Sequence, residues 1–384
     1  MKDTENTRPN APTSALPNST LSNVPRLRFP GFEGEWEKCY LGEISEYRKD
    51  RIPTSQLSVN TYVSTENMLP DYGAITAAPS IPLSNTVSAF RPGDILLSNI
   101  RPYLKKVWQA NSYGGCSNDV MVIQPKRVYD KFLYYIIAND SFINYAMSGA
   151  KGVKMPRGDK EQLMKYELSL PSIAEQEKIA SLLYLLDQRI AIQNKTIAHY
   201  ESLIRALTKI LVSTGSNKVA LQEIADIYQP QTITAKRLSG EGKYPVYGAN
   251  GIIGKYDQYN HVSAQICITC RGNTCGTVNY TLPFSWITGN SMVINVDNYI
   301  NRVNKRFLYH LLSTIDYAPF ISGSGQPQIV RNSIAKMTIT LPDILSQHHI
   351  SFFLDKLIDR RDIEKSIHRL LIQQKNHLLH NLFI

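Results

Sequence analysis

Cysteine is scarce in this sequence, with 5 residues in 384. So few cysteines cannot supply a disulfide framework, so we expect a reducing compartment and predict a cytoplasmic protein. No run of 18 apolar residues occurs, so we expect no membrane span. Residues 1–24 lack the apolar segment of a signal peptide and are rich in Pro, Asn, Ser and Thr. We expect a disordered tail there.

The motifs of DNA-modifying enzymes are also missing. An adenine methyltransferase needs an Asn/Asp-Pro-Pro-aromatic loop, and this chain has no Pro-Pro dipeptide. The glycine-rich stretch 248–255 does not have the spacing of a P-loop. The one acid-x-Lys triplet, residues 241–243 with Asp226 upstream, is a weak match to a nuclease core. We therefore predict no catalytic residues, no metal site and no cofactor in this chain.

The charge balance is basic. Lys and Arg number 42 against 32 Asp and Glu, which gives a net charge of +10. Most of the excess falls in residues 25–168 and 213–340 rather than in the segments that follow them. A polyanion such as DNA, contacted by both of these regions, fits this distribution. A slightly basic protein without such a partner fits it equally well.

The chain contains the same pattern twice, at a period of about 171 residues. Residues 170–173, Leu-Pro-Ser-Ile, recur as residues 341–344, Leu-Pro-Asp-Ile, and Gln176 recurs as Gln347. A period this long indicates two copies of a whole module, whereas solenoid repeats are much shorter. The segments that we predict are a tail (1–24), a globular domain (25–168), a spacer helix (169–215), a second globular domain (216–340) and a second spacer helix (341–384).

Each module ends in a long helical segment. In the first, Ser172 is a plausible N-cap, and apolar residues follow at alternating spacings of four and three, which is typical of a coiled-coil seam. The predicted seam positions are Ile179, Leu183, Leu186, Ile190, Gln193, Ile197, Tyr200, Ile204, Leu207 and Leu211. The second seam is less regular and is predicted at Ile350, Leu354, Leu357, Ile363, Ile367, Leu371, Gln374 and Leu378.

The globular regions alternate short β-rich runs with turns and one short helix. The predicted β-rich runs and turns are residues 90–97, 106–108 and 119–123, followed by a helix over 130–147. The second module repeats this order, with a helix over 305–313. We predict a mixed α/β fold in which two globular domains are separated by two long helices packed as an antiparallel coiled coil with pseudo-twofold symmetry. The alternative is that the helices pair with another protein or a second copy.

Basic and aromatic residues gather in loops of both modules. Lysine suits phosphate contacts, whereas Arg, Asn and Gln can make bidentate hydrogen bonds to base edges. The loop residues that we single out as DNA contacts are Arg101, Tyr103, Lys105, Lys106, Lys151, Lys154, Arg157, Gln326, Gln328 and Arg331. Solvated loop charges without a ligand are the alternative for any one of them.

Several of these segments resemble a known family, the specificity (S) subunits of type I restriction–modification systems. The likeness extends over residues 25–384 and includes the half-chain repeat itself. The segments that carry it are residues 27–32 with Trp36, 41–44, 94–104, 154–157, 170–179, 244–254 and 270–273. Asn250, Arg271 and Asn273 lie in the last two of these segments and complete our set of candidate DNA contacts.

The resemblance implies a DNA-binding subunit without catalytic activity. Each globular domain would read half of a split target in double-stranded DNA, and the helices would set the gap between the halves. The helices would also dock two methyltransferase (M) subunits, which use S-adenosylmethionine and flip the adenine out of the duplex. Motor–nuclease (R) subunits using ATP and Mg²⁺ would complete a defence complex. A nuclease acting alone on DNA and a coiled-coil protein-binding scaffold remain as alternatives.

Overall fold

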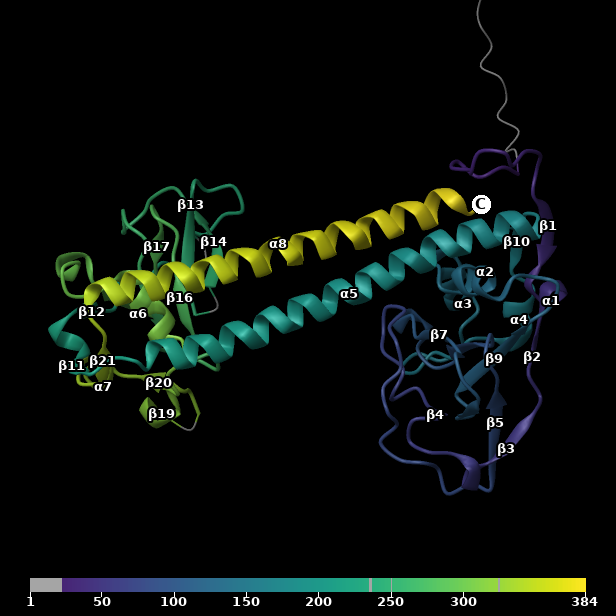
Figure 1. Ribbon diagram of the computed structural model, residues 1–384, viewed down its shortest axis with the longest axis horizontal. Helices are drawn as coiled ribbons and strands as arrows, with labels where there is room; N and C mark the ends of the chain where they lie inside the picture. The colour runs from purple at the N-terminus through teal and green to yellow at the C-terminus, as the bar shows by residue number, and fades with distance from the viewer. Residues whose placement is uncertain (1–22, 235–236, 250, 324) are drawn as a thin grey trace, which may run out of the picture. The chain divides into compact units, whose positions relative to one another are not determined.

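The computed structural model describes residues 23–384 except residues 235–236, 250 and 324. It divides into two units (Figure 1), of which unit 1 comprises the described residues up to Ala191 together with Arg369–Ile384, and unit 2 comprises Ile192–His368. Each unit therefore contains part of both long helices, α5 (Ile173–Val212) and α8 (Ile344–Leu382). The predicted tail falls almost entirely outside the described residues.

Unit 1 is built on a four-stranded antiparallel sheet in the order β2-β9-β6-β7. A second sheet has the order β3-β5-β8-β4, and β1 pairs with β10. The elements before α5 are β1 (Glu37–Tyr40), α1 (Leu41–Ile44), β2 (Ser45–Tyr47), β3 (Arg51–Pro53), β4 (Tyr62–Val63), β5 (Thr86–Phe90), β6 (Ile95–Ser98), β7 (Val107–Gln109), β8 (Gly114–Cys116), β9 (Val120–Pro125), α2 (Asp130–Ile137), α3 (Asp140–Ser148), α4 (Lys160–Met164) and β10 (Glu167–Leu170).

Unit 2 has a four-stranded antiparallel sheet in the order β12-β18-β15-β16. Its other sheets are β14-β13-β17, β11-β21 and β19-β20. The elements between α5 and α8 are β11 (Asn217–Ala220), β12 (Asp226–Tyr228), β13 (Tyr244–Gly248), β14 (Gly251–Tyr256), β15 (Ile266–Thr269), β16 (Val278–Tyr280), β17 (Trp286–Ile287), β18 (Ser291–Asn295), α6 (Lys305–Leu312), β19 (Ile321–Ser322), β20 (Gln328–Ile329), α7 (Arg331–Ala335) and β21 (Thr338–Leu341).

The two units share one frame. The sheet β2-β9-β6-β7 has the same strand order and antiparallel pairing as β12-β18-β15-β16, and the pair β1-β10 corresponds to β11-β21. Strands β6 and β15 are buried along their whole length, which explains why they read as continuous apolar runs. The remaining sheets differ in strand number and order. The two units therefore share the four-stranded sheet and the two-stranded pair, and they differ in their remaining sheets.

The long helices pack against each other in each unit. In unit 1, Ile179 and Leu183 of α5 share a core cluster with Leu379 and Leu382 of α8. In unit 2, Val212 at the other end of α5 joins the core cluster against which the early part of α8 packs. The helices are therefore antiparallel, and the mixed α/β fold with two long packed helices is confirmed. Among the described residues, no helix has the length and hydrophobicity needed to cross a bilayer.

The predicted seam of α5 agrees with burial in the structure. All ten positions are buried or half-buried, whereas Leu185 and Ile192 between them are 66% and 63% exposed. The polar position, Gln193, donates a hydrogen bond from Nε2 to the main-chain oxygen of Glu364 at 3.1 Å and another to its carboxylate. These two residues occupy equivalent places in the two repeats, 171 residues apart. This polar pair fixes one alignment of the two helices.

The predicted seam of α8 is wrong at two positions. Ile363 is 51% exposed and Gln374 is exposed, while Glu364 is only 6% exposed. The regular spacing of three and four places Glu364 and Lys375 in the seam despite their charge. Their partners explain this, because Arg360 pairs with Glu364 at 2.7 Å and Asp187 of α5 pairs with Lys375 at 2.6 Å. The apolar pattern alone does not reveal such partners.

The predicted helix over 130–147 is two helices in the structure, α2 and α3. The break falls at Asn139, whose side-chain oxygen accepts the backbone N–H of Ser141 at 3.0 Å. An Asn in this position caps the N-terminus of a new helix, so the preceding helix ends before it. In unit 2 the corresponding helix α6 ends at Leu312, close to the predicted 313.

A buried glutamine fastens each long helix to its unit. The Gln176 side chain accepts the N–H of Tyr129 at 2.9 Å and donates to the Pro171 oxygen at 2.8 Å. Gln347 does the same with the N–H of Asn304 and with Pro342, at 2.8 and 2.9 Å. Both glutamines are 1% exposed. The two amides therefore connect the start of a long helix to the start of a short one.

We expect Gln176→Leu to lower the free energy of unfolding of unit 1 by about 2–4 kcal/mol, because two backbone groups are left without partners in a buried site. Urea denaturation of the full chain measures this change. Gln373→Leu is the matched control, since Gln373 is exposed on α8. Equal stability of the two variants would contradict the fastening role.

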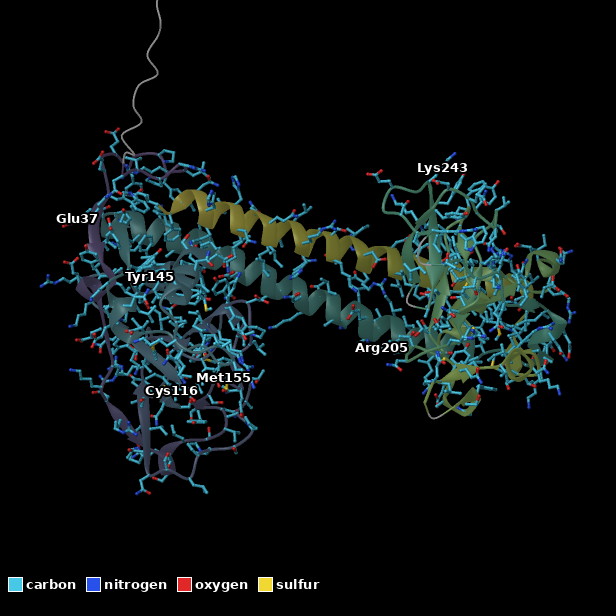
Figure 2. The ribbon with its side chains drawn as sticks, turned by 180° about the vertical axis from the view of Figure 1, so that it is seen from behind. Glu37, Cys116, Tyr145, Met155, Arg205 and Lys243 are labelled. Carbon is cyan, nitrogen blue, oxygen red and sulfur yellow. The ribbon has the colours of Figure 1, made fainter. Side chains whose placement is uncertain are left out.

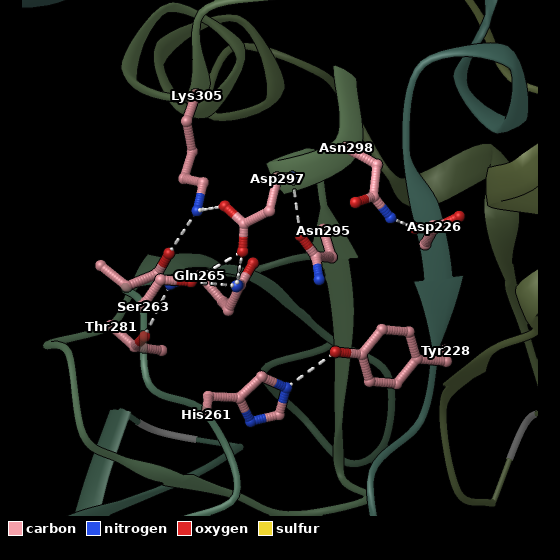
Figure 3. Close-up of polar contacts among 11 residues, drawn as sticks. Asp226, Tyr228, His261, Ser263, Gln265, Thr281, Asn295, Asp297, Asn298 and Lys305 are labelled. Atoms are coloured by element: carbon pink, nitrogen blue, oxygen red, sulfur yellow. Dashed lines mark hydrogen bonds and ion pairs between the residues drawn. The ribbon is translucent and has the colours of Figure 1, made fainter. Parts of the chain in front are cut away.

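Each unit also has a polar network beside its central strand. In unit 2, the Asp297 carboxylate accepts hydrogen bonds from Ser263 and Gln265, both at 2.7 Å, and pairs with Lys305 (Figure 3). These interactions connect the segment before β15 to the first residue of α6. In unit 1, the residue equivalent to Gln265 is Asp94, which is 2% exposed. The same position is thus polar and buried in both units.

Candidate nucleic-acid interface

A short hairpin projects from unit 1 between α3 and α4. The N–H of Lys151 donates to the oxygen of Arg157, and the N–H of Arg157 donates back to Lys151, both at 2.9 Å. Gly152 begins the loop with a φ of 101°, a left-handed conformation that favours glycine. We call residues 151–157 the unit 1 hairpin. It contains three of the predicted DNA contacts.

The unit 1 hairpin lies against the loop that follows β6. The N–H of Arg101 donates to the Pro156 oxygen at 2.8 Å, and the N–H of Gly158 donates to the Asn99 oxygen at 3.1 Å. Arg101 and Lys105 adopt left-handed φ values of 51° and 54°, which is strained for residues with a side chain and is common at functional sites. Two predicted clusters that are far apart in the sequence therefore form one surface.

Unit 2 has the same arrangement. Ser322 pairs with Gln328 in the hairpin of β19 and β20, and the N–H of Gly272 donates to the Pro327 oxygen at 2.9 Å. All four positions lie 171 residues after their counterparts in unit 1. We call the described residues of 322–328, which omit residue 324, the unit 2 hairpin. The repeat thus places one hairpin and one loop together in each unit by the same backbone hydrogen bonds.

Four of the seven predicted contact residues in unit 1 already have partners within the unit. The pairs are Lys105 with Asp140 (2.9 Å), Lys106 with the Thr65 oxygen (2.5 Å), Lys151 with Asp159 (2.9 Å) and Arg157 with Asp119 (3.1 Å). The Lys151 ammonium and two backbone N–H groups hold the pKa of Asp159 below its ordinary value. These four side chains therefore help to fix the loops from which they come.

The other three residues are Arg101, Tyr103 and Lys154. All three are exposed, with 48% of Tyr103 accessible. Within the part of the chain that the structure describes, their side chains make no hydrogen bond or ion pair. Their functional groups are therefore free to bind a ligand from solution.

In unit 2, three predicted residues line one open cavity of about 420 Å³. These are Arg271, Asn273 and Gln326, and the rest of the wall comes from Ala249, Gly272, Thr274, Gly325 and Pro327. Gln328 and Arg331 are exposed nearby in the sequence, and Arg331 begins α7. Asn250 lies outside the described residues. The cavity offers guanidinium and amide groups, the chemistry that recognises base edges and phosphates.

Sequence reasoning found these cations but missed the acids that hold them. Asp119, Asp140 and Asp159 each pair with a predicted contact residue. Asp159 lies only eight residues after Lys151 in the sequence, and this short separation was a weak indication that the two could pair. Asp119 and Asp140 come from other parts of the unit, and nothing in the sequence pointed to them.

The three residues of the nuclease alternative are exposed, and two of them interact with other side chains. Asp226 accepts hydrogen bonds from Asn298 at 3.0 Å and Tyr299 at 3.4 Å, as Figure 3 shows for the first of these. Glu241 and Lys243 are exposed, and the Lys243 ammonium lies 5.2 Å from the centre of the Tyr244 ring. Among the residues described, no three His, Cys, Asp or Glu side chains are grouped so that they could hold a metal ion.

The chain is similar in sequence to specificity subunits of type I restriction enzymes. The chain is 31% identical over 169 residues to the EcoDI type I restriction enzyme specificity subunit of Escherichia coli, which is 42% of this chain and 37% of that protein. It is 26% identical over 155 residues to S.HindORF215P of Haemophilus influenzae, which is 39% of this chain and 40% of that protein. Each match thus spans about two fifths of the relative's length or less.

Two solved structures share the fold. The S subunit of a type I restriction–modification system from M. genitalium superposes with a TM-score of 0.68 at 16% identity, over 94% of this chain and 99% of that one. A second structure, from work on complex assembly and conformational transition of the type I R-M system, superposes with a TM-score of 0.55 at 18% identity. This match covers 90% of this chain and 96% of that one. The family profile described as type I restriction modification DNA specificity domain matches residues 33–201 and 214–371. The chain therefore belongs to this family and contains its domain twice.

Proposed function

We propose that this chain is the sequence-specific DNA-binding subunit of a type I restriction–modification complex. Residues 25–168 and 216–340 act as two target-recognition domains, each of which binds one half of a split target in double-stranded DNA. The chain itself catalyses no reaction. The observation that carries the proposal is the hairpin-and-loop pair that recurs in both units at the same offset, with predicted contact residues on each copy.

Charge supports DNA as the ligand. The exposed cations Arg101 and Lys154 in unit 1 and Arg271 and Arg331 in unit 2 have no acidic partner among the described residues. Phosphates supply the missing counter-charge, and the amides of Asn273 and Gln326 suit base edges. A guanidinium or ammonium group that neutralises a phosphate releases a bound counterion, so binding becomes steeply salt-dependent.

The partners belong to the same proposal. Two methyltransferase subunits dock on the long helices and supply S-adenosylmethionine chemistry, and motor–nuclease subunits supply ATP hydrolysis and Mg²⁺-dependent cleavage. Exposed apolar side chains on both helices, such as Leu185, Ile192 and Phe352, offer a docked subunit apolar surface to bury there.

The test uses the full chain with and without the methyltransferase subunit of its host. The chain alone should bind duplex DNA with a steep salt dependence but should neither cut nor methylate it. The two together should methylate adenine in a split sequence. A chain that fails to direct methylation to any defined sequence would overturn the proposal, and cleavage by the chain alone with Mg²⁺ would support the nuclease instead.

The helices act as the ruler between the half-sites in this proposal. Inserting four residues into both α5 and α8 adds about 6 Å of helix. We therefore expect the gap between the half-sites to grow by roughly one or two base pairs, at 3.4 Å per pair. Sequencing of methylated adenines measures the gap. If the gap stays the same while methylation persists, the helices do not set it.

A further inference from the structure

The tip of the unit 1 hairpin is apolar although its surroundings are basic. Val153 is 100% exposed and Met155 is 50% exposed, and both flank the free cation Lys154 (Met155 is labelled in Figure 2). Val153 therefore contributes nothing to the core of the unit. Arg101, whose backbone N–H donates to the Pro156 oxygen of the hairpin, is likewise exposed without a partner among the described residues.

The backbone holds this tip in a defined conformation. Two hydrogen bonds between Lys151 and Arg157 close the hairpin, and Pro156 accepts a third from Arg101. The side chains of Lys151 and Arg157 are tied to Asp159 and Asp119 on either side. The apolar groups are thus presented by a fixed loop, which reduces the entropy that a ligand must remove on binding.

Unit 2 differs at the same place. The residue equivalent to Met155 is Gln326, and the residue equivalent to Lys154 is Gly325. Both line the cavity that contains Arg271 and Asn273. The same hairpin therefore presents hydrogen-bonding groups in unit 2 and aliphatic groups in unit 1. The two units contain different chemistry for reading a duplex.

DNA offers few apolar groups to a side chain that approaches its bases. In the major groove, the edges of the base pairs carry hydrogen-bond donors and acceptors, and the 5-methyl group of thymine is the apolar exception. A tip in which two aliphatic residues flank a free cation, on a hairpin bonded to the Arg101 loop, is complementary to that pattern, since the cations can contact phosphates while the aliphatic groups contact a methyl group. A purely hydrogen-bonding readout leaves Val153 and Met155 without a role.

We propose that Val153 and Met155 determine specificity by contacting thymine methyl groups in the half-site bound by unit 1. The half-site bound by unit 2 is read instead by hydrogen bonds from the cavity around Arg271 and Gln326. This inference rests on the proposed function and adds the chemical class of contact in each half. Thymine methyl groups should therefore contribute to binding affinity in the half-site of unit 1 and not in the half-site of unit 2.

The test replaces thymine with deoxyuridine, which removes only the methyl group. The full chain with its methyltransferase subunit is titrated with duplexes that carry deoxyuridine at each thymine of one half-site, using the target found from methylated adenines. We expect about four-fold weaker binding for each thymine methyl group whose contact with the hairpin is lost. This loss should occur only in the half-site bound by unit 1. The variant with Val153→Ser and Met155→Gln, which removes the methyl groups from the tip, should bind thymine and deoxyuridine duplexes equally.

Leu83→Ser provides the matched control, because Leu83 is another fully exposed aliphatic residue of unit 1, outside the hairpin. It should keep the thymine preference. Indifference of the unaltered chain to deoxyuridine in both half-sites would overturn this inference, as would a preference that survives in the hairpin variant. Weaker methyltransferase binding in that variant, with the thymine preference intact, would identify the tip as a protein-binding surface instead. Failure to discriminate the target from a scrambled duplex would overturn the proposed function itself.

Discussion

Replacing Asp94 with alanine is expected to lower the free energy of unfolding of unit 1 by about 3–5 kcal/mol. Arg48 donates to both oxygens of this carboxylate, from Nε at 2.6 Å and from a terminal nitrogen at 2.8 Å, and the N–H of Arg91 donates a third bond at 2.8 Å. The side chains of Arg48 and Asp94 are 8% and 2% exposed. Alanine leaves a desolvated guanidinium without its main counter-charge.

Hydrogen exchange of the full chain measures this destabilisation locally. Amides of β6 and β9 should exchange roughly a hundred- to several-thousand-fold faster, while those of β15 and β18 in unit 2 stay unchanged. Replacing both partners with apolar residues, Arg48→Met with Asp94→Leu, should recover much of the stability because no buried charge remains. Unchanged exchange in the Asp94→Ala variant would show that the ion pair does not stabilise unit 1.

Removing either of the two predicted contact cations of unit 1 that lack an internal partner, Arg101 or Lys154, is expected to weaken DNA binding strongly. Lys154→Ala should weaken binding to all duplexes about eight-fold at 0.1 M salt and should reduce the salt slope by about one, because one phosphate is no longer neutralised by an ammonium group. Arg101→Ala should cost about 1–3 kcal/mol and relax the sequence preference in one half-site, since a guanidinium can read a base edge. Titrations at several salt concentrations separate the two effects.

Lys105 provides the comparison for this prediction. Its ammonium pairs with Asp140, so Lys105→Ala removes a charge that is already partly neutralised. We expect a smaller decrease in affinity and a smaller change in salt slope than for Lys154→Ala. Equal effects of both substitutions would mean that internal ion pairs do not distinguish the cations that bind DNA from those that hold the loops.

The frame of each unit was predictable from the sequence because its signals are local. The buried strand β6 reads as an apolar run, and the repeated Leu-Pro and Gln positions marked the start of each long helix. Burial of charge was not predictable. Glu364 occupies the α8 seam because Gln193 and Arg360 bind it, and these interactions depend on the packing of two helices.

The candidate site was predictable in part. Composition singled out the loops around Arg101 and Lys154, and the repeat pointed to the equivalent loop around Gln326. The pairing of hairpin with loop depends on backbone hydrogen bonds between segments more than fifty residues apart, which no local pattern encodes. Whether a cation is free or tied to an acid is likewise a property of the folded unit, as Lys154 and Lys105 illustrate.

Sequencing of methylated adenines, in a host that expresses the chain with its methyltransferase subunit, tests the central claim most directly. The account predicts a split motif of two short half-sites with a fixed gap. Substituting Gln326 and Gln328 with alanine should change or relax one half-site and leave the other half-site and the gap unaltered. A continuous motif, or a change in both half-sites together, would contradict the claim that each unit reads its own half of the target.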